Sequence, residues 1–336
     1  MGSSLIPQDK VFGGRMIMKF SFFRTFFYFL IFEIIVGSWG CASRTLQTNL
    51  TTPIDYKKIM ARQKADIADE EAAMKKVPEK NGEGYEISGD QFLSQGKIDL
   101  AFKQYYEALR LDPGKERLRY KMGRLFLEKG LPEEAKKEFQ EIVKVNPNHA
   151  LAFEGLGRAY FHMREFSEAE KSFREAIQLD PELWQAHNFL GINYDHQGNY
   201  DAAITEYWTA IALRPKVGSL FNNLGMSLFL KGEYAKAVMA FAEAVKFEPS
   251  NKRICNNLGL ALYKLGKYSE ALEVFKKGGD EPGAYYNMGS LFMMEGKNRE
   301  AVAAFERAIE AKPAFYTGAY EKKKKAQAAL DTHQQE

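Results

Sequence analysis

The sequence contains little of the chemistry that enzymes and metal sites need. Its 336 residues include only two cysteines, Cys41 and Cys255, and five histidines. Two cysteines can form neither a disulfide framework nor a four-thiolate zinc site. The sequence has no Walker loop for phosphate, no H-E-x-x-H and no G-x-S-x-G. It therefore predicts a protein that is not an enzyme and that has no cofactor and no metal site.

An excess of charge of one sign is also absent. Lys and Arg total 47, Asp and Glu total 44, and the net charge is +3. This balance argues against a nucleic-acid-binding protein, which usually presents a strongly basic face. Hydrophobic residues make up 45% of the chain, a fraction that excludes a disordered protein. With 25 Phe and 17 Tyr, the chain can form a large aromatic core.

A long hydrophobic run occurs near the N-terminus, at residues 20–40. Positive charge precedes its apolar part, and small residues follow it up to Cys41. This order is typical of a secretory signal, and translation from Met16 or Met18 would give that signal an ordinary length. Residues 1–41 are therefore predicted to be a signal peptide or a membrane anchor. The polar, highly charged residues 42–81 are predicted to be a linker.

The end of the hydrophobic run, Gly40–Ser43, resembles the cleavage box of bacterial lipoproteins. That resemblance implies that Cys41 is lipidated and becomes the first residue of the mature chain. Trp39 and Glu33 depart from the pattern, and the alternative is an uncleaved membrane helix. In either arrangement the chain is tethered to a membrane and its remainder lies across that membrane.

The rest of the chain follows one repeating pattern. A glycine recurs seven times, with five spacings of 34 residues and a last spacing of 30, at positions 89, 123, 157, 191, 225, 259 and 289. An alanine follows each glycine by 12 residues, and an aromatic residue follows the alanine by four. The aromatic residues are Tyr105, Phe139, Phe173, Tyr207, Phe241, Phe275 and Phe305. Proline closes six of the seven units. A fixed period of this size indicates a repeat architecture.

This pattern of Gly, Ala, aromatic and Pro resembles the tetratricopeptide repeat (TPR). The resemblance implies an all-α fold, a right-handed α-solenoid of seven helix-turn-helix units. The predicted units are 82–115, 116–149, 150–183, 184–217, 218–251, 252–281 and 282–315, with a capping helix and tail at 316–336. Six units have a glycine at the end of the first helix, where a left-handed residue is needed, but the third has Arg164. The third turn is therefore expected to differ, and the short sixth unit should lose about one helical turn.

The first helix of each unit is expected to line a concave groove that binds a partner protein or peptide. In units two and three this groove is predicted to be basic and partly aromatic, through Arg117, Tyr120, Arg124 and Arg158. In units five to seven the candidate residues are Asn223, Met226, Phe229, Asn257, Leu260, Tyr263, Tyr286 and Asn287. The three asparagines hold one place in successive units and resemble a ladder that pairs with a peptide backbone. The alternatives are that the asparagines brace the helices and that the methionines fill the core.

The sequence thus predicts a non-catalytic, membrane-tethered TPR scaffold of the bacterial cell envelope. It would be an outer-membrane lipoprotein with its repeats in the periplasm and with no nucleic-acid partner. Repeats such as His187–Gly191 and Asn256–Gly259 resemble those of assembly lipoproteins for tight-adherence (Flp) pili and secretion machines. Two other functions stay open. One is a structural bridge in the envelope or in polysaccharide export, and the other is an accessory subunit that delivers substrates to a separate transferase.

Overall fold

The computed structural model describes residues 81–311 and 317–333. The predicted signal or anchor (1–41, with Cys41) and the predicted linker up to residue 80 lie outside the described residues. In the described part every regular element is an α-helix and no strand occurs. The first helices of the repeat units are α3 (Gly82–Ser94), α5 (Glu116–Glu128), α7 (Ala150–His162), α9 (Trp184–His196), α11 (Gly218–Lys231), α13 (Lys252–Lys264) and α15 (Glu281–Met294). The second helices are α4 (Ile98–Leu111), α6 (Pro132–Val145), α8 (Phe166–Leu179), α10 (Tyr200–Leu213), α12 (Tyr234–Phe247), α14 (Tyr268–Gly278) and α16 (Asn298–Ala311).

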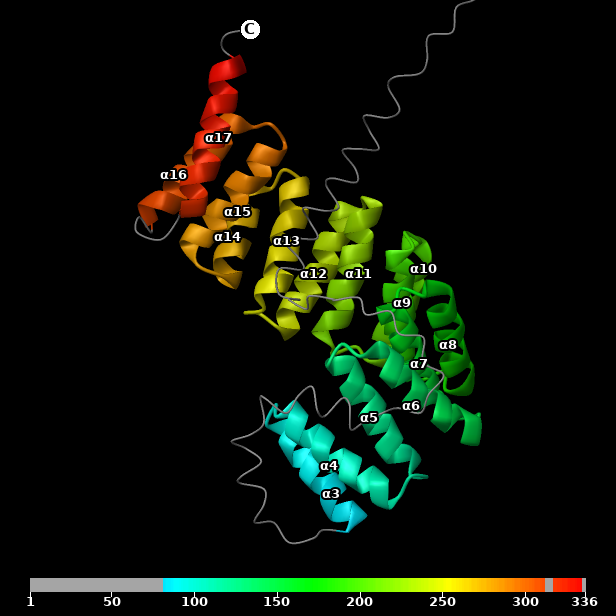
Figure 1. Cartoon of the computed structure of the whole chain (residues 1–336). Helices are drawn as coiled ribbons and strands as arrows, with labels where there is room; N and C mark the ends of the chain where they lie inside the picture. Colours follow the sequence, from blue (N-terminus) through cyan, green and yellow to red (C-terminus); the bar gives the residue numbers. More distant parts are fainter. Residues whose placement is uncertain (1–80, 312–316, 334–336) are drawn as a thin grey trace, which may run out of the picture. The chain divides into compact units, whose positions relative to one another are not determined.

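The two helices of each unit pack together through a contact between a glycine of the first helix and an aromatic ring of the second. A Cβ added to the repeated glycine of any unit would lie less than 3.0 Å from the ring of that unit's aromatic residue. The rings themselves are at most 4% exposed. Glycine is thus required because the second helix places its largest side chain directly on the first helix. The paired helices are visible in Figure 1, where α3 and α4 are cyan and α11 and α12 are yellow-green.

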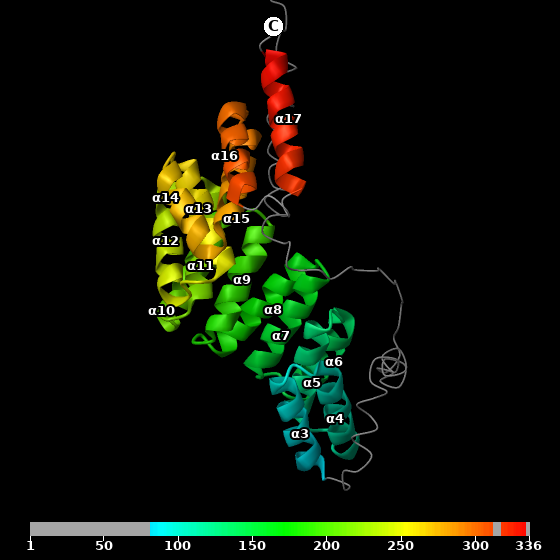
Figure 2. The same cartoon turned by 90° about the vertical axis from the view of Figure 1, so that its left-hand side faces the viewer.

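The first and second helices line opposite faces of the stack. Successive first helices contact one another directly. These contacts join α5 to α7, α7 to α9, α9 to α11 and α11 to α13. Each second helix packs between the first helix of its own unit and that of the next. Below, the surfaces are called the first-helix face and the second-helix face. The order of hairpins along the chain can be followed in Figure 2.

The turn of the third unit corrects one expectation. Arg164 has φ 64°, the same left-handed conformation that the glycines of the other six turns adopt at φ 69° to 91°. The turn therefore does not differ, and the arginine adopts a backbone conformation that costs a non-glycine residue about 1–2 kcal/mol. The contacts on both sides of the turn, which repeat in every unit, hold it in this conformation.

Replacing Arg164 by glycine should therefore stabilise the chain. The relief of the left-handed conformation outweighs the greater entropy of glycine in the unfolded chain, and the expected net gain is about 0.5–1 kcal/mol. Chemical denaturation followed by circular dichroism measures the change. Replacing Arg164 by alanine is the control, because alanine keeps the backbone penalty, and an equal gain in both variants would contradict this explanation.

The sixth unit is shortened as its sequence predicts. Its second helix, α14, has 11 residues, whereas the other second helices have 14. Gly278 ends this helix directly against Cys255 in α13, and a Cβ at position 278 would clash with the Cβ of Cys255. The absence of a side chain at position 278 thus lets the end of α14 pack against α13 in the shortened unit.

The last helix, α17 (Thr317–His333), packs on the seventh unit. It lies beside α16 in both views (Figures 1 and 2). Ala319 and Ala326 are its buried residues, with 0% and 1% exposure. Lys322 donates a hydrogen bond to the Ser290 hydroxyl and lies over the Tyr286 ring, 4.6 Å from its centroid. The helix thus covers part of the first-helix face of the seventh unit.

Candidate functional site

The predicted asparagines of units five to seven each donate a hydrogen bond to an asparagine of the preceding unit. The amide of Asn257 donates to Asn222 at 2.8 Å, and that of Asn223 donates to Asn188 at 2.9 Å. Asn287 donates to Asn256 at 3.4 Å. Each bond joins the first helices of two neighbouring units, and Asn257 is only 3% exposed. The ladder therefore braces the stack, which is the alternative that the sequence left open.

Most other candidates in units five to seven belong to the core. Phe229, Leu260 and Tyr263 are 4%, 7% and 2% exposed, so the prediction that they line a binding groove needs correction. Tyr263 packs edge-on against Phe292 of the next unit, with ring centroids 5.4 Å apart. Met226 is half-buried.

Tyr286 lies beneath α17, where it contacts Lys322. Little of the predicted surface in units five to seven is therefore open to a partner.

The basic and aromatic residues of units two to four, in contrast, surround a real hollow. It has a volume of about 150 Å³ and is lined by Tyr120 and Arg124 of α5, Leu151, Glu154 and Arg158 of α7, and Gln185 and Phe189 of α9. Three of the predicted groove residues thus meet at one place on the first-helix face. Phe189, at the asparagine position of the fourth unit, contributes the aromatic wall.

The cations of the hollow are incompletely paired. The Arg158 guanidinium lies 4.7 Å from the Phe189 ring centroid, and its Nη1 is 3.6 Å from the Glu154 carboxylate. Its Nε is buried and has no hydrogen-bond partner within the described chain. Arg124 is exposed and forms no ion pair with any described residue. Burial raises the pKa of Glu154, although the two arginines oppose that shift. The hollow is therefore net positive and suits a carboxylate.

Arg117 has a structural partner instead. Its Nε lies 2.7 Å from the carboxylate of Glu86 in the first unit, which also binds Lys121 at 2.8 Å and Lys115 at 3.1 Å. Burial alone would raise the pKa of Glu86, but the three cations lower it to about 2. Arg117 therefore links the first two units through an ion pair, and its guanidinium is not left unpaired for a ligand.

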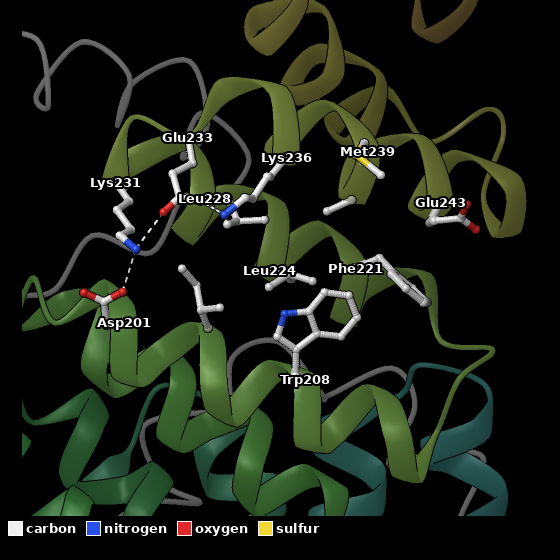
Figure 3. Close-up of a pocket in the computed structure, with 12 residues that line it drawn as sticks. Asp201, Trp208, Phe221, Leu224, Leu228, Lys231, Glu233, Lys236, Met239 and Glu243 are labelled. Carbon is white, nitrogen blue, oxygen red and sulfur yellow. Dashed lines mark ion pairs between the residues drawn. The ribbon is translucent and has the colours of Figure 1, made fainter.

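A second and larger hollow lies on the second-helix face, for which the sequence predicted no binding site. Its volume is about 500 Å³, and it lies between α10 and α12 above α11 (Figure 3). The apolar lining residues are Ile204, Trp208, Phe221, Leu224, Leu228, Met239 and Ala240. Trp208 and Met239 are 54% and 71% exposed. The rim carries a chain of ion pairs from Asp201 through Lys231 and Glu233 to Lys236.

A comparison of registers could have revealed the unusual apolar side chains of this hollow, although not the hollow itself. The place of Met239 is occupied by a lysine in each of the first three units, Lys103, Lys137 and Lys171. The place of Trp208 carries Gln140, Arg174, Lys276 or Glu306 in four other units. The apolar surface is thus a local departure from a solvated face, and exposed apolar patches with a polar rim mark interaction sites.

The described residues contain no cluster of three or more side chains suited to a metal ion. Nor does any helix in the described part of the chain have the length and hydropathy of a membrane-spanning segment.

Family models of this repeat match most of the hairpins. Two models described as tetratricopeptide repeat match residues 120–183 and 163–217 and residues 282–315, and one described as TPR repeat matches 89–130 and 225–266. Together these segments span more than half of the chain. The chain belongs to the tetratricopeptide repeat family. This membership agrees with the helix pairs and with the repeated glycine and aromatic contacts.

Several solved structures resemble this one. A tetratricopeptide repeat protein from Parabacteroides merdae is 17% identical, with a TM-score of 0.51, and the match covers 73% of this chain and 98% of that one. MamA is 29% identical over 48% of this chain and 94% of its own, with a TM-score of 0.42. YrrB, described as a TPR protein with an unusual peptide-binding site, is 22% identical over 55% of this chain and 97% of its own, with a TM-score of 0.45. No curated protein matches the chain. The first of these similarities supports the fold alone.

Proposed function

We propose that this TPR protein is a non-catalytic scaffold that holds a partner polypeptide on its first-helix face. The observation that carries the proposal is the hollow of units two to four, which Arg124 and Arg158 both line. Arg158 has only one acidic neighbour, Glu154 at 3.6 Å, and Arg124 forms no ion pair with any described residue. The TPR fold typically serves protein interaction, so a polypeptide is the ligand class that fits. An extended segment with an acidic side chain would place its carboxylate between the arginines, because guanidinium and carboxylate form strong charge-assisted hydrogen bonds.

The aromatic wall adds to this recognition. Phe189 already stacks on the Arg158 guanidinium, which keeps the planar group in one orientation. Tyr120 packs against Phe139, 5.8 Å between ring centroids, and against His149. The side chains that would contact a ligand therefore lie on packed helices. Their order before binding keeps the loss of conformational entropy on binding small.

Replacing Arg124 by glutamate tests the proposal. The side chain is exposed and unpaired in the described chain, so the change should leave the fold intact. The probe is a fluorescent ten-residue peptide with alternating Glu and Ser, measured by anisotropy. We expect binding to weaken at least about tenfold, which corresponds to about 1.4 kcal/mol. The binding of the unchanged protein should also weaken with rising salt.

Arg299→Glu is the matched control, because it makes the same charge change in a second helix, α16, at an exposed arginine that also forms no ion pair with any described residue. An equal loss in both variants would mean that only net charge matters. If the unchanged protein does not bind the acidic peptide any better than its Gln-for-Glu counterpart, the assignment of the hollow fails. A bridging role in the envelope would then be favoured.

We further propose that residues 1–41 tether the scaffold to a membrane of the bacterial envelope, with the repeats in the periplasm. The support is the signal-like order of charge, apolar run and Cys41 in the sequence. Assembly of a pilus or a secretion machine is the role that the sequence resemblance suggests. The Cys41→Ser variant, followed by membrane fractionation, separates a lipid anchor, whose loss would release the chain, from an uncleaved membrane helix, which would retain it.

A further inference from the structure

The α12 side chains that line the second-helix hollow are arranged symmetrically about the middle of the helix. Along α12, the side chains that line the hollow are Lys236, Met239, Ala240 and Glu243. These positions are i, i+3, i+4 and i+7, so they form one stripe along the helix. Met239 and Ala240 are central, and the two opposite charges lie at equal distances on either side. A half-turn about the centre of the stripe therefore places the position of Lys236 on that of Glu243.

Such a stripe is complementary to itself. If two copies of α12 pack antiparallel about Met239 and Ala240, Lys236 of each copy faces Glu243 of the other. The small Ala240 permits close approach, and it is 6% exposed at the bottom of the stripe. Isologous twofold interfaces require this kind of self-complementary patch.

The apolar surface supplies the driving force for this contact. Trp208 and Met239 are large and mostly solvent-exposed, and they stand on either side of a hollow of about 500 Å³ (Figure 3). Met239 of one copy would enter the hollow of the other, which removes apolar surface from water on both sides. Aromatic and methionine side chains at the centre of a patch with a charged rim are typical of protein interfaces.

The charges of the rim permit this exchange. Lys236 binds Glu233, and Glu243 binds Lys246, in pairs whose lysines are 70% and 66% exposed. Exposed ion pairs of this kind contribute little, so exchanging them for pairs between copies costs little. The pairs from Asp201 to Lys236 alternate in sign, so the rim presents no excess charge to a second copy.

We propose that a second copy of this chain covers the second-helix hollow, through antiparallel packing of α12 on α12 about a twofold axis at Met239 and Ala240. This interface is independent of the peptide site proposed on the opposite face. It would double the number of peptide sites in each assembly.

A cysteine at the axis tests this arrangement in the full chain. Met239→Cys, treated with a mild oxidant, should give a disulfide-linked species of twice the chain mass. Lys171→Cys is the matched control, because Lys171 holds the same register in α8 and is 71% exposed. The unchanged chain, with Cys41 and Cys255, is the second control. An equal yield in all three, no linked dimer, or a link to a protein of another mass would overturn the proposal.

A charge exchange then tests the pairing itself in the Met239→Cys background. Lys236→Glu alone or Glu243→Lys alone should lower the yield of linked dimer about tenfold, since each creates two like-charge contacts. The double exchange should restore the yield. If the double exchange stays as low as the single changes, the antiparallel register is wrong. Peptide binding to the Arg124 hollow should be the same in all these variants, so failure of one proposal leaves the other testable.

Discussion

Replacing Phe139 by alanine should destabilise the repeat stack by about 3–5 kcal/mol. Phe139 is 0% exposed, and its ring contacts the glycine positions of two successive first helices, Gly123 and Gly155. The ring thus closes its own hairpin and also joins it to the next one. Its removal leaves a cavity at both contacts, which glycines with no side chain cannot fill. Chemical denaturation followed by circular dichroism at 222 nm should show the midpoint shifted to lower denaturant.

Val145→Ala is the matched control for this change. Val145 is in the same helix but is 72% exposed, so its truncation should alter stability by less than about 0.5 kcal/mol. A loss below about 1 kcal/mol for Phe139→Ala would contradict the central role of the ring. A second outcome is also informative. If the stack unfolds in two separate transitions in the variant, the ring is the link that couples the units before and after it.

Between about pH 4 and pH 7, Asp195 should lower the stability of the folded chain as pH rises. Asp195 accepts hydrogen bonds from Ser227 of the next unit at 2.6 Å and from Tyr207 at 2.8 Å. Burial raises its pKa from 3.8 to about 6, although the two hydrogen bonds favour the charged form. In this interval the folded chain binds a proton that the unfolded chain has released, so stability falls with increasing pH. The full effect is up to about 3 kcal/mol above pH 6.

The Asp195→Asn variant isolates this effect. Its free energy of unfolding, relative to that of the unchanged protein, should rise by up to about 3 kcal/mol between pH 4 and pH 7. The difference is the proper measure, because Glu86, with its lowered pKa, contributes stability that is lost as pH falls. Asp201→Asn removes a carboxylate that is 80% exposed and serves as control. A difference that stays flat with pH would show that Asp195 remains ionised in the folded chain.

The two hollows differ in how far the sequence could predict them. Tyr120, Arg124 and Arg158 could be assigned to one face because they recur at fixed distances from the repeated glycines. The position of a residue within the repeat does not show whether its side chain is paired with a charge from a neighbouring unit. Arg117 pairs with Glu86 of the preceding unit, whereas Arg124 forms no ion pair with any described residue, and only the placement of the neighbouring unit decides this.

The repeat period, the paired helices, the role of the small and aromatic residues and the shortened sixth unit were determined by the sequence itself. The first three depend on local contacts that recur in every unit, so the sequence shows them seven times, and the shortened unit is visible as the one departure from the 34-residue spacing. Only the tertiary structure decided that the asparagines brace the stack and that Phe229, Leu260 and Tyr263 are buried. It also decided that α10 and α12 leave an apolar hollow between them. These features depend on the distance and rotation between successive units, which bring together residues about 35 positions apart, and no local pattern specifies that geometry.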